Sequence, residues 1–312
     1  DSSFAGNKTA QGNQDSNEIG DFYYTPPTGF LALCTSNLPD VAVTPSEHFN
    51  TVLYTGTGSS QSITGVGFQP DFVWAKKRSE QGWHHLYDAI RGTTKVLYSN
   101  VTDAENTSTT NLTSFDVDGF SLGGAGGLGG DSPPVNAVAW NWKAPTSSNL
   151  TAAGERSMAT TSKLNADAKF EIITYTGNGT AGAKIGHSLG VPPELLIIRR
   201  RNAANTWTVY CPPAVDETKK IHLETYDPVV SNGTTLNSTA PTSTAITLGN
   251  DNRSNGNGDT YVIYAFASVD GYSKFGSYTG NGSTDGTFVY TGFKPMWVMV
   301  KRTTSNHDWD IY

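Results

Sequence analysis

The sequence predicts an all-β protein made of tandem antiparallel β-sandwich modules of the jelly-roll or concanavalin A-like type. Three observations lead to this prediction: a motif that recurs three times, apolar residues that alternate with a period of two, and turns rich in Gly, Asn and Asp. The composition agrees with it. Only 16% of the 312 residues are charged and 33 are glycine, which is not typical of a helical enzyme.

A short motif marks the start of each repeat. Tyr-Thr-Gly-Thr-Gly at residues 54–58 returns as Tyr-Thr-Gly-Asn-Gly at 175–179 and at 278–282. Each copy leads to a proline followed by an apolar segment with a basic end, at residues 70–78, 193–201 and 295–302. A chain that repeats one unit in tandem usually builds length or valency rather than a single active site.

The repeats divide the chain into five segments. We expect residues 1–48 to hold the end of an upstream domain and a linker, and residues 145–168 to form a second linker with one weak helical turn at most. Complete modules are expected at 49–144 and 169–267. Residues 268–312 begin a third, truncated copy, with apolar strands near 274–279 and 294–302 and an aromatic segment at 309–312.

The first module shows the alternation most clearly. Large apolar groups recur at every second position in three segments, with Phe72 and Trp74 in one and Trp140 and Trp142 in another. We expect about seven short strands here, too many for one flat sheet, and therefore a two-layer sandwich. Both Trp140 and Trp142 are predicted to be core residues of the first module.

The second module should repeat the first with the same strand order. The alignment places Tyr175 over Tyr54 and Tyr264 over Trp140, with Ile197 near the position of Trp74. Register is fixed by the buried face of each strand, so these pairs should occupy equivalent sites.

Charge and cysteine content exclude several classes of protein. The net charge of −7 argues against nucleic-acid binding, which needs a basic face. No run of 18 apolar residues occurs, so no membrane insertion is expected. Cys34 and Cys211 lie at non-equivalent places in different segments and are predicted to be free thiols. No cofactor is implied.

The densest group of site-like residues is Trp83, His84 and His85. Adjacent histidines could ligate a metal or act as acid and base. In a strand, however, neighbouring side chains point to opposite faces, so both could not easily face one ion. We align Trp83 with Trp207 and Trp309, so the aromatic residue recurs while the histidines do not. We favour core aromatics and surface histidines, with ligand binding as the alternative and no metal site.

Two polar, Gly-rich loops occupy the same place in the two modules, at residues 123–131 and 250–259. No helix is expected after them, so they do not form a phosphate-binding loop. Long loops at the end of a sandwich are either surface connections, which we favour, or binding loops. The candidate binding residues are Gly126, Asp131, Asn252, Arg253 and Asn257.

Two further motifs have structural explanations that we favour. Asp116 and Asp118 resemble the start of a calcium loop, but the remaining ligands are absent and Asp118-Gly119 is a typical hairpin turn. The basic ends of the apolar segments could bind an acidic polysaccharide. Their fixed position instead indicates pairing with acidic neighbours or a module interface.

Residues 20–39, which include Asp-Phe-Tyr-Tyr-Thr-Pro-Pro-Thr-Gly-Phe-Leu-Ala-Leu, resemble the closing strands of SPRY-like, concanavalin A-like domains in bacteriophage structural proteins. In those proteins tandem modules of unknown function follow. Residues 49–143 look like such a module, with Gly-Phe-x-Pro-Asp-Phe-x-Trp, Arg91-Gly92 and Ala-Trp-Asn-Trp. The second module departs from this pattern, since it lacks the Arg-Gly pair and has Tyr264 and Phe266 for the two tryptophans.

The resemblance implies a non-enzymatic virion structural protein, part of a fibre or surface appendage with lectin-like sandwiches. It carries over no catalytic residues. Expected partners are other virion subunits, including copies of the chain itself as a trimer or polymer, and the expected location is the virion or an extracellular appendage. Both ends of the chain are expected to continue in a longer polypeptide. The alternatives are a glycan-binding adhesin and a polysaccharide depolymerase.

Overall fold

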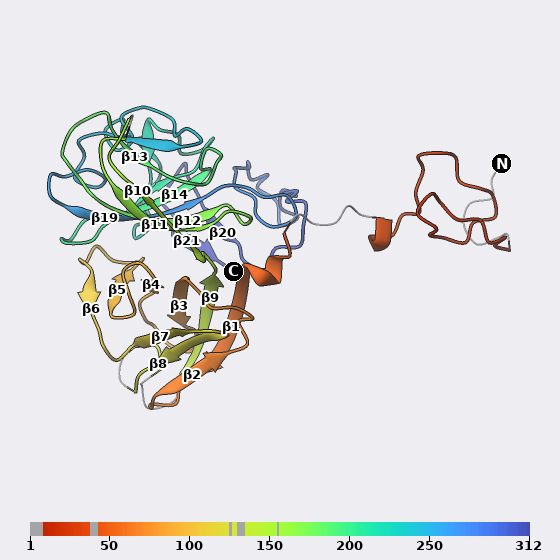
Figure 1. The fold of residues 1–312 in the computed structure, drawn as a ribbon, viewed down its shortest axis with the longest axis horizontal. Helices are drawn as coiled ribbons and strands as arrows, with labels where there is room; N and C mark the ends of the chain where they lie inside the picture. The colour runs from red at the N-terminus through yellow and green to blue at the C-terminus, as the bar shows by residue number, and fades with distance from the viewer. Residues whose placement is uncertain (1–8, 38–42, 125–126, 130–134, 155) are drawn as a thin grey trace. The chain divides into compact units, whose positions relative to one another are not determined.

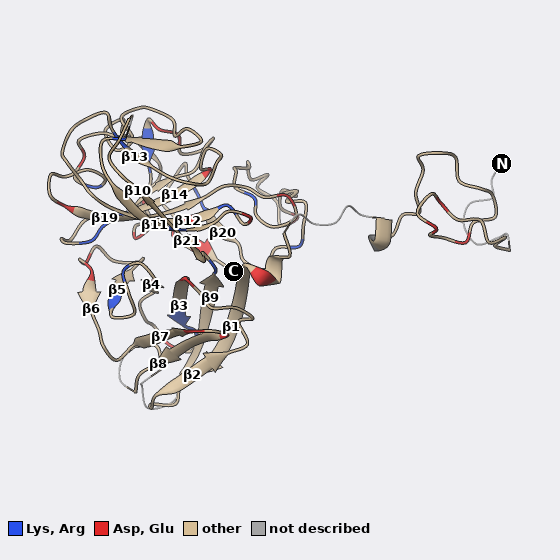
Figure 2. Ribbon diagram, in the orientation of Figure 1, with Lys and Arg blue, Asp and Glu red and all other residues tan. Residues whose placement is uncertain are grey.

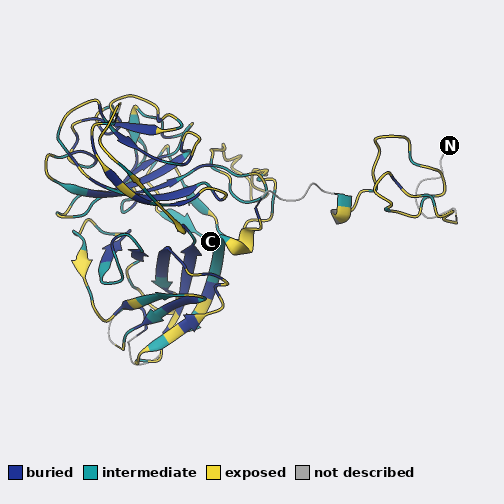
Figure 3. Cartoon of the chain, in the orientation of Figure 1, coloured by how far each residue is buried: buried dark blue, intermediate teal, exposed yellow. Residues whose placement is uncertain are grey.

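The computed structural model describes residues 9–37, 43–124, 127–129, 135–154 and 156–312, which belong to two compact units, 1–42 and 43–312 (Figure 1). The strands of the second unit are largely buried and its loops exposed (Figure 3). Acidic and basic residues are interspersed along its ribbon (Figure 2). In these described ranges no helix is long and apolar enough to cross a membrane.

The first unit is irregular over residues 9–37. The Asp15 carboxylate organises it by accepting hydrogen bonds from the backbone N–H of Ile19 at 3.1 Å and of Ala32 at 2.7 Å, and from the Asn37 side chain at 2.6 Å. The closing strands that the resemblance implied for residues 20–39 do not form in the described part of this unit, where 35–37 are a 3₁₀ turn, η1 (Thr35–Asn37). No strand forms there because the described unit contains no sheet to which these residues could pair.

The first module is a two-layer sandwich that follows a short 3₁₀ turn, η2 (Pro45–Glu47). One sheet has the order β1-β9-β3-β4-β5-β6 and the other the order β2-β8-β7. Their inner faces enclose an apolar core that includes Val73, Tyr87 and Phe120. The strands are β1 (Phe49–Thr55), β2 (Gln61–Thr64), β3 (Phe72–Lys77), β4 (His85–Asp88), β5 (Lys95–Tyr98), β6 (Asn106–Thr107), β7 (Leu112–Asp116), β8 (Gly119–Leu122) and β9 (Asn136–Trp142).

The second module has the same plan. Its large sheet has the order β10-β11-β12-β19-β14-β15, and β13-β18 covers its inner face, with a further pair formed by β16 and β17. The strands are β10 (Thr146–Leu150), β11 (Thr160–Asn165), β12 (Phe170–Thr176), β13 (Ala183–Gly186), β14 (Leu195–Arg200), β15 (Thr208–Tyr210), β16 (Lys219–Lys220), β17 (Val230–Ser231), β18 (Ala245–Leu248) and β19 (Thr260–Phe266).

The two modules share the order and register of their central strands, as predicted, with β1-β9-β3-β4 in the first module and β12-β19-β14-β15 in the second. They differ at the edges of the large sheet and in the second sheet, which has three strands in the first module and two in the second. In the first, Trp74 of β3 lies opposite Trp140 of β9. In the second, Ile197 of β14 lies opposite Tyr264 of β19. The pairings between the named strands of both modules are antiparallel. The chain is therefore an all-β protein of tandem antiparallel sandwiches.

Residues 145–168, expected to be a linker, instead form the β10–β11 hairpin, which extends the large sheet of the second module. The apolar alternation is hidden there because the buried positions of β11 include Thr160 and Ser162. The Ser162 hydroxyl satisfies its hydrogen bonding within the protein, donating to Glu171 Oε1 at 2.6 Å. Polar side chains with internal partners can occupy a buried face at little cost.

A third core joins the modules. The outer faces of the two large sheets pack on each other through Phe72, Trp74, Trp140 and Trp142 on one side, and through a matching set on the other. That set includes Phe170, Ile172, Ile197, Trp207 and Tyr264. Trp140 and Trp142 are buried, as predicted, at 7% and 6% exposure. They face the second module rather than the interior of their own sandwich, so the prediction that they belong to the core of the first module is wrong.

The third copy contributes one short hairpin, β20 (Met299–Lys301) and β21 (Trp309–Ile311). Trp297, Met299, Trp309 and Ile311 pack against the core between the modules, and the Trp297 ring lies 5.6 Å from that of Trp142. The apolar segment near 274–279, expected to be a strand, forms none. The core between the modules therefore covers the face of the third copy that carries these four side chains.

Three smaller predictions agree with the structure. Cys34 and Cys211 are free thiols. Asp118 lies in the turn between β7 and β8, where its carboxylate accepts hydrogen bonds from two backbone N–H groups. Several of the basic strand ends pair with acidic residues. Arg200 pairs with Asp259 within the second module, and Arg201 pairs with Glu105 across the module interface.

Candidate functional site

The first module carries an open groove of about 670 Å³ beside β4, β5 and β6. It lies where the β3–β4 connection, the segment after β5 and the Gly-rich loop after β8 meet. It is lined by Lys77, Gln81, Gly82, Trp83, His85, Tyr98, Asn100, Asn106, Thr107, Ser108, Thr110, Asn111 and Gly127. We call this feature the groove.

Aromatic rings form one wall of the groove. The Trp83 side chain is 49% exposed, although it is a large apolar group. Its ring lies on that of Tyr98, with centroids 4.7 Å apart, and the His85 ring meets Tyr98 edge-on at 5.0 Å. Tyr98 and His85 are buried. The exposed indole therefore packs against a base of buried aromatic side chains. The expectation of a core Trp83 and surface histidines is thus wrong for Trp83 and His85.

The two histidines point in opposite directions: His85 is the first residue of β4, and His84 comes directly before it. His84 turns toward the core between the modules, where its Nδ1 accepts a hydrogen bond from the Trp74 indole N–H at 3.0 Å. His85 lines the groove, with Nδ1 3.1 Å from the Trp83 carbonyl oxygen. Burial lowers the pKa of each histidine to about 4. Both are therefore neutral at pH 7.

The remaining lining is polar and uncharged apart from Lys77. Asn100 Oδ1 accepts a hydrogen bond from the His84 backbone N–H at 3.0 Å, and Thr107 Oγ1 accepts one from Lys95 Nζ at 2.8 Å. The Lys77 ammonium is paired with Glu80 at 2.6 Å. No carboxylate is among the lining residues in the described ranges, and no cluster of metal-ligating side chains occurs in them.

The Gly-rich loop closes the groove at Gly127. A Cβ atom at this position would lie 3.1 Å from His85 Cε1, which is tighter than ordinary contact. Glycine therefore leaves room above the His85 ring. Two candidate residues of this loop, Gly126 and Asp131, lie outside the described residues.

The same location in the second module is filled. Gly123 follows β8 and its N–H donates to the Asn111 carbonyl, while Gly249 follows β18 and donates to the Thr235 carbonyl. Gly127 lies in the loop after β8, and Arg253 lies in the corresponding loop after β18. The strand register likewise matches Trp83 with Thr206.

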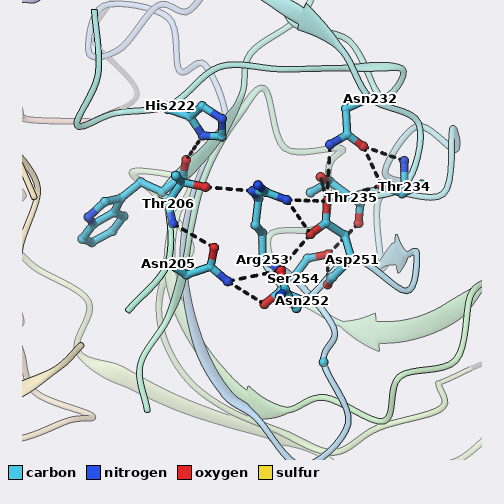
Figure 4. Close-up of polar contacts among 12 residues, drawn as sticks. Asn205, Thr206, His222, Asn232, Thr234, Thr235, Asp251, Asn252, Arg253 and Ser254 are labelled. Atoms are coloured by element: carbon cyan, nitrogen blue, oxygen red, sulfur yellow. Dashed lines mark hydrogen bonds and ion pairs between the residues drawn. The ribbon is translucent and has the colours of Figure 1, made fainter. Parts of the chain in front are cut away.

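Arg253 makes internal contacts that close this second location (Figure 4). Its Nε donates to Thr206 Oγ1 at 2.8 Å and its Nη1 to Asp251 Oδ1 at 3.1 Å. The Asn252 carbonyl accepts a hydrogen bond from the Asn205 side chain at 3.1 Å. Asn257 is exposed beside Gly179. Asn252 and Arg253 thus take part in a structural network, and the structure brings only Trp83, His85 and the Gly-rich loop of the first module together.

Sequence reasoning missed half of the groove. Tyr98, Asn100, Asn106, Thr107 and Asn111 come from one segment that carries no motif. The strand register also corrects our alignment. Trp74 pairs with Leu86 in the first module, and the equivalent residue Ile197 pairs with Val209 in the second. The counterpart of Trp207 is accordingly His84, and Trp83 has no aromatic counterpart. The signal for this site in the sequence was Trp83, a tryptophan without an aromatic equivalent in the other copies.

Comparison with known proteins gives a family match. The pattern of a family described as a domain of unknown function (DUF7483) matches residues 44–312. No curated protein and no solved structure matches the chain. Since the matched residues include both sandwiches and the third copy, the chain belongs to the DUF7483 family.

Proposed function

We propose that this protein is a non-enzymatic component of a virion fibre or surface appendage and that the groove binds a neutral glycan. The observation that carries the proposal is the exposed Trp83 indole, fixed on Tyr98 at the side of a groove lined by amides and hydroxyls. A pocket with an apolar platform and a few convergent polar groups is the usual form of a small-ligand site.

The chemistry of the lining favours a sugar. A flat indole face packs against the C–H face of a pyranose ring, while Asn and Thr side chains supply both donors and acceptors for hydroxyl groups. Because His85 is neutral at pH 7 and Lys77 is paired with Glu80, the groove offers little charge to an acidic polysaccharide. A neutral saccharide matches this lining better than a sulfated or uronic-acid chain.

Binding is favoured over hydrolysis because glycosidases use a pair of carboxyl groups on either side of the scissile bond, about 5–9.5 Å apart. The described lining of the groove includes no Asp or Glu. Glu80, which pairs with Lys77, is not one of the lining residues. These observations support a site that holds a glycan without cleaving it.

The virion assignment rests on the resemblance of residues 20–39 and 49–143 to phage structural proteins. Tandem sandwiches give the length that a fibre requires, and repeated copies of a weak site give avidity when several chains assemble. A trimer or polymer that presents its grooves outward would bind a host surface glycan in this way.

The test is a glycan array of neutral and acidic saccharides, followed by titration calorimetry of the hits. Trp83→Ala should weaken binding about tenfold or more, equivalent to about 1.4 kcal/mol. The matched control is Tyr226→Ala, which removes an exposed aromatic ring outside the groove. Binding confined to acidic glycans, or unaffected by Trp83→Ala, would contradict the proposal. Release of reducing ends would show an enzyme instead.

A purely structural role is the second candidate, favoured by the core between the modules. Phe72 of the first module and Tyr264 of the second stack at 4.3 Å, so the two sandwiches are joined as one body rather than as beads on a linker. A rigid double module is suited to act as a spacer. The absence of any glycan binding, together with single cooperative unfolding of both modules, would favour this candidate.

A further inference from the structure

The groove presents its hydrogen-bonding groups in fixed roles, and His85 supplies an acceptor. Its Nδ1 lies 3.1 Å from the Trp83 carbonyl oxygen, which can only accept, so Nδ1 carries the ring proton and donates it there. The ring is neutral at pH 7 because burial lowers its pKa to about 4. A neutral imidazole has a single N–H group, so Nε2 is an acceptor. This nitrogen has no hydrogen-bond partner among the described residues.

Gly127 keeps that acceptor open. A Cβ atom at this position would lie 3.1 Å from His85 Cε1 and 3.2 Å from Nε2, so any other residue type would crowd the nitrogen edge of the ring. Although His85 as a whole is only 4% exposed, this edge borders Gly127, and both residues line the groove. The edge lacks a hydrogen-bond donor, which a ligand can bring.

Two asparagines of the groove supply donors. Asn100 Oδ1 accepts a hydrogen bond from the His84 backbone N–H at 3.0 Å, and Asn106 Oδ1 accepts one from the Thr107 backbone N–H at 2.7 Å. Because a backbone N–H can only donate, these contacts fix which side of each amide is the oxygen. The Nδ2 groups, with two hydrogens each, are therefore the parts left to donate. Both asparagines are exposed and line the groove.

The sheet places the acceptor and a donor on either side of one aromatic ring. His85 on β4 pairs with Tyr98 on β5, and Asn106 lies on the next strand, β6. Neighbouring strands are about 4.8 Å apart, so the backbones of β4 and β6 are separated by about 10 Å, with Tyr98 between them. The Trp83 ring lies on that of Tyr98. The groove thus combines an apolar platform with polar groups of opposite and fixed role at its sides.

We infer that the groove selects sugars that carry an acetamido group, such as 2-acetamido hexoses, over the corresponding plain hexoses. This inference rests on the proposed function and adds the class of sugar. An acetamido N–H only donates and its C=O only accepts, whereas a hydroxyl group does either. The N–H would donate to His85 Nε2, and the C=O would accept from Nδ2 of Asn100 or Asn106. A trans amide holds these two groups in opposite directions, so one planar group serves both sides of Tyr98. The sugar ring then lies against Trp83.

The experiment is titration calorimetry of the 312-residue chain with matched neutral saccharides that differ only in the group on the second carbon. One pair is chitotriose and cellotriose, and the other is the methyl glycosides of N-acetylgalactosamine and galactose. In at least one pair we expect the acetamido member to bind about tenfold more tightly, since it gains hydrogen bonds that the hydroxyl group does not match in role.

Two variants test the assigned residues. Asn100→Asp keeps an oxygen for the His84 N–H but replaces the Nδ2 donor by an acceptor, and the preference should fall about threefold or more. Asn257→Asp adds the same charge at an exposed position outside the groove and should leave the preference unchanged. His85→Phe keeps an aromatic ring against Tyr98 but removes Nε2, and the preference should disappear. If circular dichroism shows that His85→Phe is unfolded, Asn100→Asp still decides.

Nitrogen NMR gives a readout that does not depend on affinity. The His85 ring should carry its proton on Nδ1, and the Nε2 resonance should shift on addition of the acetamido sugar but not of the plain one. A proton on Nε2, or a preference unchanged in both variants, would overturn the inference. Equal affinities within each pair that fall with Trp83→Ala would reject the acetamido selection and leave glycan binding standing. No binding of any neutral saccharide would reject both.

Discussion

The ring of Phe72 in the first module stacks on the ring of Tyr264 in the second, with centroids 4.3 Å apart and planes inclined by 24°. This contact lies in the core that joins the two large sheets. Replacing Phe72 by Ala should lower the free energy of unfolding by about 3–5 kcal/mol because it leaves a cavity between the modules. Calorimetry should show both modules destabilised together. Two separate transitions in the wild-type chain would mean that the modules fold independently.

A buried ion pair should make the same interface sensitive to charge. Arg91 Nε donates to Asp88 Oδ2 at 2.5 Å, and the Tyr264 hydroxyl donates to the same carboxylate at 2.8 Å. Both charged side chains have no exposed surface. Arg91→Met should cost about 3–5 kcal/mol in urea unfolding because Asp88 is left buried without its partner. The double variant Arg91→Met, Asp88→Leu should recover part of that loss. If the single variant is as stable as the wild type, the pair contributes nothing to the interface.

Filling the groove should abolish ligand binding without loss of fold. Gly127→Arg places in this loop the residue type that Arg253 supplies in the corresponding loop of the second module. We expect glycan binding to fall below detection on the array while circular dichroism stays unchanged. Gly280→Arg adds the same charge where a Cβ meets no atom within 4 Å, and it serves as the control. Equal binding by both variants would show that the ligand site lies elsewhere.

Acid should destabilise the first module through its buried histidines. His84 and His85 have folded-state pKa values of about 4, below the usual 6.5, because burial disfavours the charged ring. The unfolded chain therefore takes up more protons than the folded one between these values. Stability from these groups is fully present above pH 6.5 and is lost as the pH falls toward 4. The free energy of unfolding in urea should change less between pH 7 and pH 4.5 for His85→Gln than for the wild type or for the exposed control His307→Gln.

Glu224 should act in the opposite direction. Burial raises its pKa to about 7, and its Oε2 accepts a hydrogen bond from the Trp207 backbone N–H at 3.0 Å. The folded protein then holds a proton that the unfolded chain has lost, so this group costs stability as the pH rises from about 4.5 to 7. Glu224→Gln should remove that loss and raise the melting temperature at pH 7 more than at pH 5. An equal change in melting temperature at pH 5 and at pH 7 would show that Glu224 is already ionised in the folded protein at both pH values.

The sequence predicted the repeated fold well because apolar periodicity reports directly on buried faces. The match of Trp74 with Ile197 and of Trp140 with Tyr264 follows from that pattern alone. The apolar periodicity failed to predict β11, because the buried residues Thr160 and Ser162 are polar and are typical of a linker. It also failed at residues 274–279, whose pattern suits a strand but whose pairing partner does not exist in the described chain.

The candidate site was half predictable for a different reason. Trp83 and His85 stand out as residue types, but the segment from Tyr98 to Asn111 becomes part of the groove only through the pairing of β5 and β6 with β4. Only the strand register shows that the alignment of the two modules must shift by one residue. His84, rather than Trp83, is then equivalent to Trp207. Local sequence indicates which residues are chemically able to bind, while long-range pairing decides which of them meet.

Gly127 and Arg253 lie in corresponding loops of a duplicated scaffold. One leaves space above the His85 ring, and the other donates a hydrogen bond to Thr206, the counterpart of Trp83. Because the two copies share one core, the loop of either copy can diverge in sequence while the other side of that core keeps the pair folded.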